Sequence, residues 1–150
     1  MKPLIILAVT LLVSGSGVYA EAPMSYVINK DNYSIDQPLT NTPGDIDNGK
    51  RVFIGRKKGN CLACHVVVQL EDMEQFHGEV GPELSTIGAD YTLEELRLRV
   101  ADARFINPVG IMPAFLKSEG HFRPIDKFAN TSILTAQEVE DVIAYLTTLR

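Results

Sequence analysis

The sequence predicts an all-α domain in which three helices are joined by long loops that contain proline and glycine. Two of the helices begin with capping boxes, at residues 92–95 and 135–138. After each box, apolar residues recur at the spacing of a helix. Together with an earlier helix, these segments place the folded domain at residues 45–150.

The first helix is expected from Asp47 to about Lys58. Asp47 or Asn48 can cap its N-terminus, and the basic residues before Gly59 suit its C-terminus. The second helix starts at Thr92 and ends before Asn107-Pro108, because a proline disfavours helical geometry in the residue that precedes it.

The third helix starts at Thr135 and carries the clearest apolar stripe, formed by Val139, Val142, Ile143, Leu146 and Leu149. We expect it to cross the first helix. Phe53 and Tyr145 are the aromatic candidates at that crossing, and Gly49 would allow the two backbones to approach closely. Residues 69–91 and 105–134 are expected to be loops.

The first twenty residues have the layout of a secretory signal. Lys2 precedes an apolar stretch that ends near Val13, and small residues follow up to Ala20. The stretch is too short to span a bilayer, so residues 1–20 are predicted to be removed after Ala20 and the product to be periplasmic, without a membrane span. Residues 21–44 are expected to form an irregular arm that docks on its own domain.

Charge excludes one class of partner. The chain carries 14 basic and 19 acidic residues, and loss of the predicted signal removes only Lys2, which leaves 13 minus 19, or −6. Such a chain lacks the basic surface that nucleic-acid binding requires.

The most informative motif is Cys61-Leu62-Ala63-Cys64-His65, the attachment signature of a covalent haem c. Each thiol can add to one porphyrin vinyl group, and His65 then points at the iron as the proximal ligand. A zinc ribbon would need a second pair of cysteines, and a dithiol redox pair gains nothing from the histidine. The chain has no other cysteine.

The distal iron ligand is predicted to be Met112, which lies beside Pro113 in a loop far enough along the chain to reach the opposite face of the ring. The other candidates are Met24, Met73, His77, His121 and the lysines. Met73 is too close to His65 in sequence, and His77 and His121 are expected to be surface or hydrogen-bonding histidines. The Pro82 carbonyl is the predicted acceptor for the second ring nitrogen of His65.

With these motifs in place, residues 45–150 resemble class I cytochromes c, and more closely the SoxX family of the periplasmic thiosulfate-oxidising system. The segments that carry the closer resemblance are residues 38–45, 59–65, 76–82, 111–115 and 133–142. The resemblance implies helices and loops wrapped around one haem c, with Cys61, Cys64, His65 and Met112 as its attachment and ligand residues.

The SoxX resemblance also implies partners. The family pairs with a SoxA-like cytochrome in a haem-dependent L-cysteine S-thiosulfotransferase, which joins thiosulfate to a cysteine of a carrier protein, and a downstream acceptor takes the electrons. Because both cysteines of this chain are used for attachment, the chain alone is not expected to turn over thiosulfate. The alternative is a generic soluble electron carrier that serves a terminal oxidase, and a haem enzyme is a third class.

Overall fold

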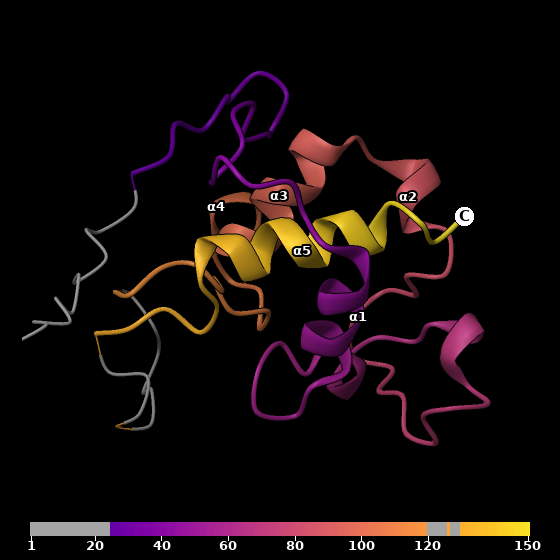
Figure 1. The fold of residues 1–150 in the computed structure, drawn as a ribbon. Helices are drawn as coiled ribbons and strands as arrows, with labels where there is room; N and C mark the ends of the chain where they lie inside the picture. Colours follow the sequence, from indigo (N-terminus) through magenta and orange to yellow (C-terminus); the bar gives the residue numbers. More distant parts are fainter. Residues whose placement is uncertain (1–24, 120–125, 127–129) are drawn as a thin grey trace, which may run out of the picture.

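The structure is a computed structural model that describes residues 25–119, 126 and 130–150. The predicted signal segment, Met24 and His121 lie outside these residues. The described chain contains helices α1 to α5 and two short 3₁₀ helices, η1 and η2, with no strand beyond an isolated bridge between Asn29 and Ser34. The all-α class is therefore confirmed (Figure 1). The bounds are α1 (Ile46–Ile54), η1 (Cys61–Ala63), η2 (Val68–Leu70), α2 (Ile87–Asp90), α3 (Leu93–Ala101), α4 (Ala103–Ile106) and α5 (Ala136–Leu146).

The crossing of α1 over α5 is the centre of the fold (Figure 1). A Cβ atom on Gly49 would lie only 1.9 Å from the carbonyl oxygen of Asp141, so the two backbones touch where a larger residue could not fit. The rings of Phe53 and Tyr145 pack edge to face at the same crossing, with centroids 5.4 Å apart. The predicted partner helices and aromatic pair are both confirmed.

The predicted bounds of α1 were wrong at both ends. Asp45, and neither Asp47 nor Asn48, is the N-cap, and its carboxylate accepts the Asn48 N–H at 2.9 Å. The helix ends at Ile54, well before Lys58, because Gly55 leaves helical geometry while its N–H still bonds the Arg51 carbonyl.

The predicted helix from Thr92 is divided in the structure. Both capping boxes are present as predicted, at Thr92 and Thr135. However, α3 ends at Ala101, Asp102 leaves helical geometry, and α4 resumes the helix as one short turn. The loop predicted over residues 69–91 also contains η2 and α2.

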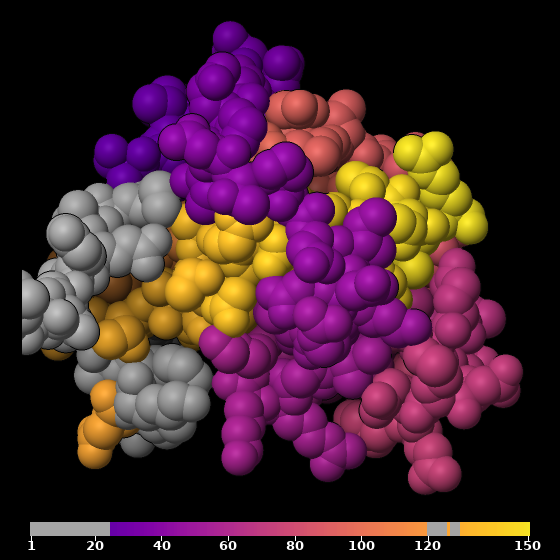
Figure 2. Space-filling view, in the orientation of Figure 1, coloured from indigo at the N-terminus to yellow at the C-terminus, as the bar shows by residue number. Residues whose placement is uncertain are grey.

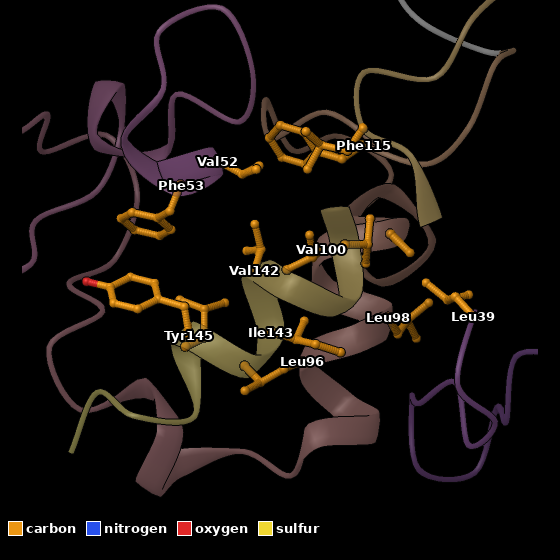
Figure 3. Close-up of a cluster of buried hydrophobic side chains, with 14 of the residues drawn as sticks. Leu39, Val52, Phe53, Leu96, Leu98, Val100, Phe115, Val142, Ile143 and Tyr145 are labelled. Carbon is orange, nitrogen blue, oxygen red and sulfur yellow. The ribbon is translucent and has the colours of Figure 1, made fainter. Parts of the chain in front are cut away.

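The core lies around α5 (Figure 3). Val142 and Ile143 of α5 are buried together with Leu96 of α3, and Phe115 covers the cluster from the loop that follows α4. Val52 joins them from α1. Helices α1, α3 and α5 therefore share one apolar core.

The arm before α1 packs on this core, and its surface lies against that of α5 (Figure 2). Ile35 and Leu39 are buried, and a buried ion pair fixes the backbone beside them. Arg97 of α3 donates to Glu140 of α5 at 2.8 Å and to the Ile35 carbonyl at 2.6 Å, while Glu140 accepts the Leu39 N–H at 2.7 Å. The described part of the arm is thus docked on its own domain, as predicted.

Candidate functional site

The two cysteines lie on one tight turn. Cys61 opens η1, and its carbonyl accepts the N–H groups of Cys64 at 3.1 Å and His65 at 3.0 Å. Asn60 precedes the turn in the left-handed conformation, with φ of 49°, which asparagine adopts more readily than most residues. Both thiols are therefore held close to the histidine by a short, locally bonded segment.

The chemistry of Cys61 distinguishes between the motif's possible roles. No disulfide joins Cys61 to Cys64. Burial raises the pKa of Cys61 to about 12, so that this sulfur stays protonated at neutral pH. Dithiol redox motifs work through a lowered thiol pKa, and the environment of Cys61 is the opposite.

His65 is buried and its ring has a fixed orientation. Its Nδ1 lies 2.7 Å from the carbonyl oxygen of Pro82. A carbonyl oxygen can only accept, so Nδ1 carries the proton and Nε2 keeps its lone pair. The imidazole is thus in the tautomer that a metal ligand requires, and the predicted contact with Pro82 is present.

Glycines let the 78–82 loop close over this turn. A Cβ on Gly81 would lie 2.4 Å from Cε1 of His65, so only glycine leaves room for the ring. The Gly81 N–H donates to the Cys64 carbonyl at 2.7 Å, and the Gly78 N–H donates to the Leu62 carbonyl at 2.8 Å. The loop that supplies the acceptor for His65 is therefore bonded directly to the cysteine turn.

Met112 lies in the long loop between α4 and α5. Its side chain is half-buried and packs against the core, whereas the neighbouring Ile111 is 71% exposed. Met73, the nearer methionine, is mostly exposed on the loop after η2. Met112 thus belongs to a different segment from the Cys61–His65 turn, and its role as a ligand stays a prediction.

His77 has a structural partner. Its Nδ1 accepts the backbone N–H of Val67 at 3.3 Å, which ties the loop before Gly78 to the chain after the cysteine turn. His77 therefore acts as a hydrogen-bonding histidine, as predicted from its sequence context.

Sequence reasoning missed several charged residues that the fold buries. Arg97 and Glu140 occupy helix positions on the apolar faces of α3 and α5, and a check of each face for charged residues would have found them. Asp102 is fully buried between α3 and α4, where no local pattern marks it.

The donor groups at this turn fit haem c. Cys61 begins the 3₁₀ helix η1 and Cys64 directly follows it, the imidazole of His65 comes next with an unprotonated Nε2, and the Gly81 backbone lies against that ring. The sequence model of the cytochrome c family matches residues 46–150. The chain belongs to the cytochrome c family. Haem c is accordingly its cofactor, and the all-α fold is that of class I.

Two solved structures of cytochromes are similar to this chain. The crystal structure of SoxXA from P. pantotrophus matches with a TM-score of 0.75 and 37% identity, over 86% of this chain and 97% of that chain. The cytochrome SorU from Sinorhizobium meliloti matches with a TM-score of 0.44 and 27% identity, over 69% of this chain and 88% of that one. A comparison with curated protein sequences finds no match.

The match to the SoxXA structure shows that this cytochrome is SoxX-like in sequence and in fold.

The described part of this cytochrome contains no helix with the length and hydropathy needed to cross a bilayer.

Proposed function

We propose that this cytochrome is the electron-transfer subunit of a heterodimer with a SoxA-like cytochrome, which oxidatively couples thiosulfate to a cysteine of a carrier protein. A bound haem would supply one-electron redox chemistry. The similarity to the SoxXA structure extends over most of this chain and most of the one chain that it matches, and it supports this proposal. The C-x-x-C-H motif supports it less, because many electron carriers share that motif.

Each proposed site residue has one task. Cys61 and Cys64 form the thioether links, His65 is the proximal ligand through Nε2, and Met112 is the distal ligand. Pro82 holds the His65 ring in its orientation through the 2.7 Å hydrogen bond, which is the observation that supports the axial assignment most directly. Because His65 and Met112 would both hold the iron of a bound haem, neither would be free to bind a sulfur substrate, and we assign sulfur chemistry to the partner.

Export completes the proposal. Residues 1–20 act as a signal cleaved after Ala20, and the mature cytochrome works in the periplasm, where haem is attached and where the SoxA-like partner, the carrier protein and a downstream electron acceptor meet it.

The heterodimer is tested by co-expression. The mature chain is produced with haem-attachment machinery, with and without a candidate SoxA-like cytochrome, and each preparation receives thiosulfate and the carrier protein. We expect a stoichiometric complex and a carrier-bound thiosulfonate only with the partner. A monomer that exchanges electrons equally well with unrelated donors, and never enters a complex, would instead identify a generic soluble carrier.

The distal ligand is tested by matched methionine variants. Met112→Ala should abolish the methionine-to-iron charge-transfer band and lower the reduction potential, because the thioether stabilises ferrous iron. Met73→Ala is the control, since Met73 is largely exposed and should leave the band unchanged. An unaltered band in Met112→Ala would make Met112 a packing residue.

A further inference from the structure

A fully buried carboxylate stands at the base of the loop that carries Met112. Asp102 joins α3 to α4, and none of its surface is exposed. Its N–H bonds the Leu98 carbonyl at 2.8 Å, and its own carbonyl accepts the Phe105 N–H at 3.0 Å. Asp102 therefore belongs to the rigid end of α3, although its side chain is charged.

The partner of this carboxylate is at the other end of the loop. Lys117 places Nζ 2.5 Å from Oδ2 of Asp102, while its side chain remains 47% exposed. The backbone beside the pair is also joined, because the Leu116 N–H bonds the Ala101 carbonyl at 3.1 Å. The two ends of the segment 103–116 thus meet at the C-terminal end of α3.

The far end of this loop has a different character. Val109 is 92% exposed and Ile111 is 71% exposed. The Gly110 N–H bonds the Asn107 carbonyl at 3.0 Å, which is a contact within the loop itself. The Met112 side chain packs against the core beside this exposed tip, so the contacts at the base of the loop and those of Met112 itself together hold the loop in place.

The arm also bears on this base. The Tyr33 ring packs against Phe105 of α4, with centroids 6.5 Å apart. Tyr26 is near Asp102, and burial together with that carboxylate raises the pKa of Tyr26 to about 12. The carboxylate is thus enclosed by the arm and α3, where it has the Tyr26 hydroxyl as a neutral hydrogen-bond partner and Lys117 as an ionic partner. A buried charge that keeps its partner is stable, but one that loses it destabilises its surroundings.

We propose that Asp102 and Lys117 are a positioning pair for the distal iron ligand: their ion pair closes the loop so that the Met112 sulfur stays on the iron. Neither residue touches the iron, and both act through Met112. The proposal rests on the proposed function, in which Met112 is that ligand. Breaking the pair should raise the fraction of molecules in which the loop is open and the sulfur is off the iron.

Imidazole measures that fraction, because it binds ferric iron only where Met112 has left, and its apparent affinity follows the population of the open state. The experiment uses the holoprotein and records loss of the charge-transfer band as imidazole is added. Lys117→Met should bind imidazole about tenfold more tightly than the wild type. We expect this size of effect because the substitution leaves the buried Asp102 carboxylate without its ionic partner, while the partly exposed Lys117 side is solvated. Lys117→Arg keeps the charge and should restore most of the original affinity.

Lys58→Met is the matched control. Lys58 is exposed to a similar degree, at 51%, and pairs with Glu138 of α5 at the same 2.5 Å, but neither residue belongs to the segment 103–116. It should change imidazole affinity by no more than about twofold, as is usual for a surface pair. Thermal unfolding of each variant shows whether a change is local to the loop or global.

The outcomes separate the pair from the ligand. Equal imidazole affinity in Lys117→Met and Lys58→Met would overturn the positioning role while leaving Met112 as the ligand. An unaltered band in Met112→Ala would instead remove the ligand itself. Where Lys117→Met yields no holoprotein, Lys117→Gln is measured in the same way: tighter imidazole binding than in Lys58→Met supports the pair, and equal binding overturns it.

Discussion

The Nδ1 atom of His65 and the carbonyl oxygen of Pro82 form a 2.7 Å hydrogen bond between the cysteine turn and the loop that closes over it. This bond fixes the tautomer of the ring as well as its orientation. Because it leaves the lone pair of Nε2 available to a metal, it determines which side of the ring can face an iron atom.

Gly81→Ala tests this arrangement. The added methyl group would lie 2.4 Å from Cε1 of His65, so the ring must turn or the loop must move. We expect a mixed-spin ferric spectrum and a lower yield of holoprotein, because the axial bond is weakened. A low-spin spectrum identical to wild type in Gly81→Ala would contradict the proposed ring position.

Gly49→Ala tests the crossing of α1 and α5. Its methyl group would lie 1.9 Å from the carbonyl oxygen of Asp141 and 2.5 Å from the carbonyl carbon. Both atoms belong to the backbone of α5, which cannot move away at little cost. We expect the free energy of unfolding to fall by about 1–3 kcal/mol, the usual cost of overpacking, in guanidinium titrations followed by circular dichroism. Arg51→Ala on the exposed face should change it by less than about 0.5 kcal/mol. An equally small change in the free energy of unfolding for Gly49→Ala and Arg51→Ala would mean that the two helices can move apart to accept the methyl group.

Asp141 makes stability depend on acid pH. Burial alone would raise its pKa, but hydrogen bonds from Asn48 and from the Asp45 N–H outweigh burial and hold the pKa below the ordinary 3.8. The carboxylate therefore stabilises the fold fully above about pH 4, and this contribution is lost as the pH falls through the lowered pKa of the folded state.

Asp141→Asn should remove this dependence. We expect a loss of about 1–2 kcal/mol at neutral pH, from weakened hydrogen bonds to the start of α1, and a smaller further loss on acidification than in the wild type. Denaturant titrations at a series of pH values between neutral and about 3 measure both effects. Parallel curves for the two proteins would exclude Asp141 as the responsible group.

Glu140→Ala tests how the arm is held. The substitution strands the buried guanidinium of Arg97 and removes the acceptor of the Leu39 N–H, so we expect a loss of about 3–5 kcal/mol and faster proteolysis within residues 25–44. In the double variant Arg97→Met, Glu140→Met, no charge is left without a partner, so part of the stability should return; the Leu39 N–H and the Ile35 carbonyl still lose their side-chain partners. An arm that resists protease in Glu140→Ala would show that its apolar residues suffice.

Much of this fold could be predicted where the signal is local. The capping boxes at Thr92 and Thr135 involve residues three apart, and each formed as expected. The pairing of α1 with α5 followed from one aromatic residue on each helix and one glycine. The contact between His65 and Pro82 followed from what an axial histidine requires of its other nitrogen.

Features set by distant partners could not be predicted. Three residues near the start of α1 are good caps, and Asp45 is selected with the help of Asp141, nearly a hundred residues away. The break at Asp102 has no glycine or proline to mark it, and its carboxylate is paired with Lys117 across a loop. The short helix α2 is held in part by the bond from the Gly88 N–H to the Leu149 carbonyl. In each case the deciding contact is absent from the local sequence.

The central claim is that one haem is bound to Cys61 and Cys64, with His65 on its iron, and the intact mass of the exported protein tests it most directly. The account predicts the mass of residues 21–150 plus one haem, and a pyridine haemochrome spectrum typical of two thioether links. The mass of the bare polypeptide, without Soret absorption, would contradict it.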